Sequence, residues 1–210
     1  MVFNSSDGIA VVKAIIKTIQ DNKAYLSEID GKIGDGDHGI NMNKGFTLAE
    51  EKLKGTESLY EGLSILSQTV MEEVGGSMGP LYGIFFEELA SKANKEKISA
   101  KDFEDMLLAA IEGIQSIGNA KRGDKTLLDT LIPAQEAFSS SLASGKDFAD
   151  CLHDMKTAAE SGWKSTENMV AKIGRASRLG ERSRGVLDAG ATSCYLILAS
   201  LADSITGLLK

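Results

Sequence analysis

Apolar residues recur every three or four positions over most of the chain. One such stretch, residues 9–19, carries isoleucine or valine at positions 9, 12, 15, 16 and 19, and another repeats the spacing at Leu63, Leu66, Val70 and Val74. Residues at these intervals lie on one face of an α-helix, where they can be buried together. Few stretches alternate apolar and polar residues with a period of two, so the pattern predicts an all-α protein.

Cap and breaker residues divide this pattern into about eight helices. Ser5 and Ser6 can cap the first helix, Ser99 and Asp102 form a variant capping box, and Pro80 suits a first helical turn. We expect helices at residues 5–23, 41–53, 57–74, 81–93, 100–117, 126–143, 146–172 and 191–209, with a further apolar segment at 24–29. No internal repeat or linker separates them, so we expect one domain spanning residues 1–210.

Composition and charge exclude some classes of protein, such as membrane-spanning and nucleic-acid-binding proteins. The hydrophobic fraction of 42% and the charged fraction of 25% are those of an ordinary globular protein. A net charge of −7 argues against direct binding of nucleic acid, because no broad basic surface would collect phosphates. No apolar run approaches the roughly 20 residues that span a membrane, and no signal peptide is evident, so we expect a cytoplasmic protein. Cys151 and Cys194 are far apart and are predicted to be core residues.

A glycine-rich stretch near the N-terminus carries three aspartates, Asp30, Asp35 and Asp37, within eight residues. Carboxylates this close repel one another unless a cation neutralises them, and hard oxygen ligands favour Mg²⁺ or Ca²⁺. A calcium loop does not fit, because its fifth and sixth positions would be Gly39 and Ile40. A solvated turn is the simpler alternative, but a turn does not need three carboxylates. The spacing therefore favours a Mg²⁺–phosphate site.

Three later stretches also suit an anionic ligand. Residues 75–79, Gly-Gly-Ser-Met-Gly, enter a helix and could hold an anion on free backbone N–H groups, although glycine before a helix is often close packing. Residues 174–185 hold four arginines, which bind phosphate well, or else form a solvated loop or a docking patch. Asp188 starts the last helix and could contact a ligand or simply cap the helix, and Thr126 has a similar capping interpretation.

Taken in order, these stretches resemble the nucleotide-binding L subunit of bacterial dihydroxyacetone kinase over essentially the whole chain. Five blocks carry the resemblance: Asp30-x4-Asp35-Gly36-Asp37-His38-Gly39-x-Asn41-Met42-Asn43, Val74-Gly75-Gly76-x-x-Gly79-Pro80-Leu81-Tyr82-Gly83, Gly123-Asp124-Lys125-Thr126, Gly174-Arg175-Ala176-Ser177-x-Leu179-Gly180-Glu181-Arg182 and Asp188-x-Gly190-Ala191-Thr192-Ser193. The sequence departs from the family at Ser77 and Met78, where members carry smaller residues.

The resemblance implies a closed barrel of eight antiparallel helices, with a nucleotide and two Mg²⁺ ions held by the loops at one end. It implies metal binding by Asp30, Asp35 and Asp37, and a catalytic role for Arg175 at the transferred phosphoryl group or in docking subunit K. Contacts to ADP or ATP are then expected at His38, Asn41, Ser77, Met78, Gly118, Leu127, Arg175, Asp188, Ala189 and Gly190.

The resemblance also implies a kinase subunit. Mg-bound ADP would be rephosphorylated by a phosphoprotein of the phosphoenolpyruvate-dependent phosphotransferase system, subunit M, and the phosphoryl group would pass to dihydroxyacetone on subunit K. An ATP-dependent kinase of the same type remains an alternative, as does a nucleotide-state sensor that contacts a transcription regulator. A homodimer is also left open.

Overall fold

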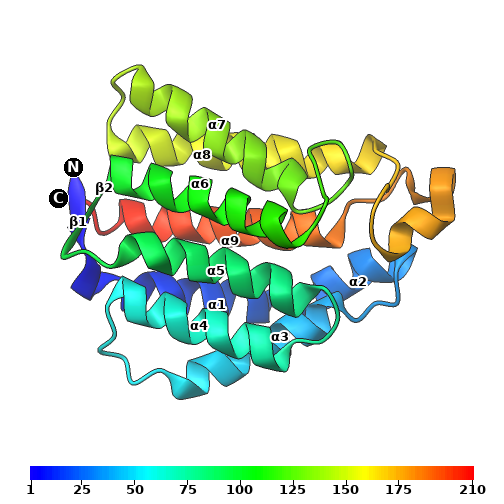
Figure 1. The fold of residues 1–210 in the computed structure, drawn as a ribbon, viewed down its shortest axis with the longest axis horizontal. Helices are drawn as coiled ribbons and strands as arrows, with labels where there is room; N and C mark the ends of the chain where they lie inside the picture. Colours follow the sequence, from blue (N-terminus) through cyan, green and yellow to red (C-terminus); the bar gives the residue numbers. More distant parts are fainter.

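The computed structural model describes all 210 residues and contains nine α-helices (Figure 1). The helices are α1 (Ile9–Asp21), α2 (Lys23–Ile33), α3 (His38–Lys52), α4 (Leu59–Glu73), α5 (Met78–Ala93), α6 (Ala100–Ile117), α7 (Leu128–Ala143), α8 (Phe148–Ser165) and α9 (Ala189–Thr206). Two short strands, β1 (Val2–Asn4) and β2 (Lys97–Ser99), and three 3-10 segments, Ser5–Asp7, Thr166–Asn168 and Arg175–Ser183, complete the fold.

Eight of the helices form a closed ring. They pack in the order α1, α3, α4, α5, α6, α7, α8 and α9, and α9 packs again on α1. Their inner faces bury one apolar cluster of 43 residues, with Phe46, Phe86 and Phe103 among the largest side chains. The predicted all-α class is therefore confirmed, and the arrangement is the eight-helix barrel that the resemblance implied. Cys151 and Cys194 lie in this core as free thiols.

The ninth helix, α2, lies outside the ring and packs on α3 and α9. The sequence indicated only an apolar segment at 24–29 here, whereas the helix continues to Ile33 and buries Leu26 and Ile29. Because of this extension, Asp30 lies in the last turn of a helix rather than in a loop.

Two predicted helix boundaries are wrong. Ser5 and Ser6 form a 3-10 turn and do not cap α1, which follows Gly8, because the residues before them pair as a strand. The helix predicted at 146–172 ends at Ser165. There the buried hydroxyl of Thr166 donates to the carbonyl of Trp163 and accepts from the N–H of Asp188, which turns the chain towards α9.

The two ends of the barrel are different. At one end β1 and β2 pair in antiparallel fashion, with Phe3 opposite Ile98, and the C-terminal Lys210 is hydrogen-bonded to Val2 (Figure 1). We call this the terminal end. Sequence periodicity could not indicate three-residue strands. The other end, the site end, holds α2 and the loops before α3, α5, α7 and α9. No helix of the chain is both long enough and apolar enough to cross a membrane.

Candidate functional site

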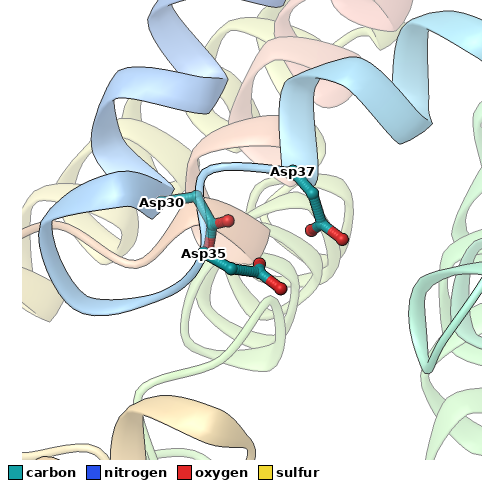
Figure 2. Close-up of side chains that lie close together, drawn as sticks. All are labelled: Asp30, Asp35 and Asp37. Atoms are coloured by element: carbon teal, nitrogen blue, oxygen red, sulfur yellow. The ribbon is translucent and has the colours of Figure 1, made fainter.

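Three aspartates gather at the site end (Figure 2). Asp30 comes from the last turn of α2, Asp35 from the loop that follows and Asp37 from the position before α3. One carboxylate oxygen from each lies within 4.8 Å of the others. A donor set of three carboxylates with no thiolate or amine suits a hard divalent cation such as Mg²⁺. The residues present therefore fit the predicted metal.

Glycines allow this arrangement. A Cβ atom on Gly34 would lie 2.4 Å from the Asp30 carboxylate, and Gly36 has a φ of +77°, which favours glycine. Asp37 is the N-cap residue of α3, yet its side chain makes no capping hydrogen bond. Its carboxylate is consequently available to a ligand rather than committed to its own helix.

Arg175 is far from the three aspartates in the sequence but lies beside their cluster in the fold. Its guanidinium forms an ion pair with Asp35, and both side chains remain largely exposed. Arg175 begins the 3-10 segment Arg175–Ser183, which packs against α2. An arginine beside carboxylates that can hold a metal is placed to contact a phosphate bound to that metal.

Four helix N-termini point towards the site end. Because neighbours in the ring are antiparallel, α3, α5, α7 and α9 all begin here. Each N-terminus carries a partial positive charge and backbone N–H groups that can bind an anion. Eight of the ten residues expected to contact a nucleotide lie at or within four residues of these starts: His38, Asn41, Ser77, Met78, Leu127, Asp188, Ala189 and Gly190.

A buried hydrogen-bonded chain joins α3 to α9. The Nε2 atom of His38 lies 2.9 Å from the hydroxyl of Ser193, and the hydroxyl of Tyr82 lies 2.5 Å from the same oxygen and donates to the carbonyl of Gly190. Burial lowers the pKa of His38 to about 4, although the nearby charge of Asp30 opposes this shift. His38 is therefore a neutral, fixed contact at neutral pH.

Asp188 caps α9, as one of its two interpretations predicted. Its carboxylate accepts a hydrogen bond of 2.7 Å from the N–H of Ala191. Desolvation raises the pKa of Asp188 to about 6, and the Ala191 hydrogen bond and the charge of Lys125 only partly offset that effect. The side chain is thus tied to the fold, while Ala189 and Gly190 follow it in the first turn.

The other predicted contacts are less closely joined to this group. Ser77 is exposed and Met78 half-buried at the start of α5, while Gly118 ends α6. Leu127 is 5% exposed and belongs to the core, so its side chain serves packing, and its backbone N and its Cβ lie near Gly190 at the start of α9. These residues share the site end, but no direct hydrogen bond links their side chains to the aspartates.

Two features of the site could not be identified from sequence. Tyr82 and Ser193 belong to quoted motifs, but nothing in the sequence indicated that they hold His38. Lys125 was part of a motif with only a capping interpretation, yet it is a buried lysine at 2% exposure. A lysine within a Gly-Asp-Lys-Thr turn carries no sequence signal of burial.

The barrel is that of a helical protein whose aspartate cluster and nearby helix N-termini suit a metal and an anion. The family model of the DAK2 domain matches residues 32–203. This chain therefore belongs to the DAK2 domain family, and the resemblance indicated by its motifs is confirmed.

Relatives of similar length support this assignment. The chain is 38% identical over 181 residues to the "PEP-dependent dihydroxyacetone kinase, ADP-binding subunit DhaL" of Escherichia coli (strain K12), covering 85% of this chain and 86% of the relative. It is 36% identical over 189 residues to the "PTS-dependent dihydroxyacetone kinase, ADP-binding subunit DhaL" of Lactococcus lactis subsp. lactis (strain IL1403), covering 89% and 91%.

A solved structure shares the fold. The dihydroxyacetone kinase from C. freundii in complex with AMP-PNP and Mg²⁺ matches with a TM-score of 0.68 and 23% identity, over 94% of this chain and 33% of that chain. At this identity the likeness concerns the fold alone.

Proposed function

We propose that this chain binds Mg-ADP at the site end and is the nucleotide-binding subunit of a phosphoenolpyruvate-dependent dihydroxyacetone kinase. The observation that carries the proposal is the position of Arg175 beside the three-aspartate cluster, at the start of α3. Relatives that the chain matches along nearly their whole length are named as ADP-binding subunits of such kinases, which supports the same function.

The aspartates would bind the metal ions, and the helix N-termini would bind the phosphates. Asp30, Asp35 and Asp37 would hold two Mg²⁺ ions, which would neutralise phosphate charge and favour in-line transfer. Backbone N–H groups at the starts of α3 and α5 would hold phosphate oxygens, since the N-cap side chains there make no capping bonds.

Arg175 and His38 would orient the transferred group. Arg175, which lies beside Asp35, would stabilise the negative charge that develops on the phosphoryl group, and it would give up part of its contact with Asp35 to do so. His38, fixed by Ser193, offers a neutral polar contact at the nucleotide. The acceptor hydroxyl would be held by subunit K, so the base that takes its proton is expected on that partner.

Exposed arginines near Arg175 would support docking of two partners. Arg178 and Arg182 are exposed on the same segment as Arg175, in a chain whose net charge is −7. Exposed arginines on this segment would suit the phosphorylated surface of a phosphotransferase-system protein, which would recharge ADP, and an acidic face of subunit K.

The resident nucleotide tests the proposal. The protein is purified gently in Mg²⁺, passed through gel filtration and denatured, and any released nucleotide is identified and counted by chromatography. Near-stoichiometric ADP is expected, and turnover should appear only when subunit K, subunit M and the phosphoenolpyruvate-driven system are all added. An empty site that exchanges ATP would identify the ATP-dependent alternative, and failure to bind either nucleotide would refute the proposal.

A further inference from the structure

A buried ammonium group lies under the arginine-bearing segment. Lys125 is 2% exposed and is the only residue other than glycine with a positive φ, at +64°. Its Nζ donates to three backbone carbonyls, those of Met169 at 3.2 Å, Ser183 at 2.5 Å and Val186 at 2.6 Å. An ammonium group has three hydrogen-bond donors, so all of them are used within the protein.

The turn that holds Lys125 is itself fixed. Asp129, at 1% exposure in the first turn of α7, accepts hydrogen bonds from the N–H groups of Gly123 and Thr126. These two residues flank Lys125 closely on both sides. The carboxylate therefore holds the backbone in the left-handed conformation that aims the lysine side chain inward, a conformation that costs free energy in a residue with a side chain.

The three carbonyls belong to both ends of one segment. Met169 precedes residues 170–182, and Ser183 and Val186 follow them, so a single ammonium group ties the two ends together. A second hydrogen bond joins the same two ends, because the N–H of Ala171 donates to the hydroxyl of Ser183, which is fully buried. We call these joined ends, residues 169–171 and 183–186, the base of the segment. In Figure 1 the loop before α7 reaches the segment that joins α8 to α9.

The segment above this base has little other support. It carries Arg175, and Gly174 and Gly180 within it have φ values of +73° and +55°. Above the base it packs against α2, and Arg175 pairs with Asp35 through exposed side chains. Nearer the base, Lys172 pairs with Asp124 and donates its backbone N–H to the carbonyl of Asp124. Exposed ion pairs contribute little to ordering a chain. The position of Arg175 therefore depends on how the segment is tied together at its base, as well as on its packing against α2.

We propose that Lys125 is a positioning residue that closes the base of residues 169–186 and thereby holds Arg175 at the aspartate cluster. The role of Arg175 at the phosphates rests on the proposed function, but the tie itself does not. Lys125→Met removes the three donors while keeping a side chain of similar length, and it leaves three inward-facing carbonyls without their partner. The segment should then open while the barrel stays folded.

Hydrogen exchange measured by mass spectrometry on the full chain tests the tie without any nucleotide. In Lys125→Met, peptides from residues 169–186 should exchange at least about tenfold faster than in the unchanged protein, while peptides from α1 and α6 do not change. Lys172→Met is the matched control, because it removes an exposed ion pair with Asp124 from the same segment. It should change exchange little. Lys125→Arg, which keeps the charge and the donors, should restore most of the protection.

A double-mutant cycle tests positioning. Mg-ADP affinity is measured by calorimetry for Arg175→Ala, Lys125→Met and the double variant, after circular dichroism has shown that each is folded. If Lys125 acts through Arg175, each single change should weaken binding about tenfold and the double variant should be little weaker than either. A merely structural contribution would instead make the two losses multiply. Should Lys125→Met not fold, Lys125→Gln, which keeps two donors, replaces it in both measurements.

The outcomes separate this inference from the proposed function. Unchanged exchange in residues 169–186, or multiplying losses in the cycle, would overturn the positioning role of Lys125. If the unchanged protein binds no Mg-ADP, the proposed function fails, while the exchange measurement still decides whether Lys125 ties the segment. If Lys172→Met raised the exchange rate of residues 169–186 as much as Lys125→Met does, the specific role of Lys125 would also be contradicted, because the segment would then be sensitive to any change near its base.

Discussion

The two ends of the barrel begin their helices differently. At the terminal end α4, α6 and α8 start with side-chain caps, in which Ser58, Ser99 and Asp147 accept a hydrogen bond from the N–H three residues ahead. At the site end α9 has such a cap from Asp188, but the N-cap residues of α3 and α5, Asp37 and Ser77, make no such bond. Caps that complete a helix within the protein stabilise the fold, whereas uncapped starts leave N–H groups for a ligand.

The site end also contains the less favourable local arrangements. Three carboxylates lie together there, Lys125 adopts a left-handed conformation and Asp188 is desolvated. Each of these costs free energy in the protein alone. The terminal end contains the pairing of β1 with β2 and the capping boxes instead. One end of the barrel therefore stabilises the fold while the other is arranged for binding, and changing matched residues at each end tests this difference.

The largest effect is expected at the aspartate cluster. Asp35→Asn removes a charge from the predicted metal site, so Mg-ADP affinity should fall by more than about a hundredfold. The free energy of unfolding, measured in the presence of a chelator, should change by no more than about 0.5 kcal/mol, because Asp35 is exposed. Calorimetry and chemical denaturation measure the two quantities.

Asp203→Asn is the control for this change. Asp203 is an exposed carboxylate on α9 that pairs with Lys156, away from the cluster. Its replacement should leave Mg-ADP affinity as it was. If Asp35→Asn retains nucleotide as well as Asp203→Asn does, the metal assignment is wrong.

The next effect concerns the close contact of α2 with α3. A Cβ atom on Gly39 would lie 2.0 Å from the carbonyl oxygen of Lys23, so Gly39→Ala must separate the helices that carry Asp30 and Asp37. We expect a loss of about 3 kcal/mol in the free energy of unfolding, together with loss of Mg-ADP binding. Chemical denaturation and calorimetry measure both.

A glycine at the terminal end provides the comparison. Gly145 has open space around its Cβ position but a φ of +83°. Gly145→Ala should therefore cost only about 1 kcal/mol, from backbone strain, and should leave Mg-ADP binding intact. Equal losses of stability at the two positions would show that the α2–α3 contact can relax.

Periodicity and caps predicted most of the fold. The heptad-like spacing of Leu63, Leu66 and Val70 and the capping box at Ser99 predicted α4 and α6 because both signals are local in sequence. The sequence did not predict β1 and β2, whose pairing joins residues almost a hundred positions apart. Nor did it predict that α2 would extend to Ile33, since that helix has a weak apolar face and its last turn contains Gly31 and Lys32.

The aspartates were predictable because like charges close together in the sequence need a cation. Arg175 was predictable as one of four arginines, but its selection over the others depended on family resemblance. Its contact with Asp35 depends on the packing of the segment against α2. The Lys125 tie and the Ser193–His38 bond join residues 44 to 155 positions apart, and no local pattern encodes such contacts.

A smaller effect is expected from the titration of Asp188. Its folded-state pKa of about 6 lies above the ordinary value of 3.8, so the folded protein binds the proton more tightly than the unfolded chain. Stability from this group is present at about pH 4 and is lost as the pH rises through 6. The full shift in pKa corresponds to roughly 3 kcal/mol, most of which is lost between pH 4 and pH 7.

The comparison with Asp188→Asn isolates this titration, because asparagine can still cap α9. The free energy of unfolding of the unchanged protein, minus that of the variant, should fall by roughly 2 kcal/mol between pH 4 and pH 7 in chelator. Denaturant melts at each pH measure it. Parallel curves for the two proteins would mean that Asp188 is solvated like an ordinary surface carboxylate.

The smallest effects compare one serine at each end. Ser99 caps α6 at the terminal end, so Ser99→Ala should lower the free energy of unfolding by about 1 kcal/mol and leave Mg-ADP affinity unchanged. Ser77 makes no capping bond at the start of α5, so Ser77→Ala should leave stability unchanged and weaken Mg-ADP binding about fivefold. Thermal melts and calorimetry on both variants give the four values. A Ser77 variant that loses stability without losing affinity would remove the distinction between the two ends, because its hydroxyl would then serve the helix rather than the ligand.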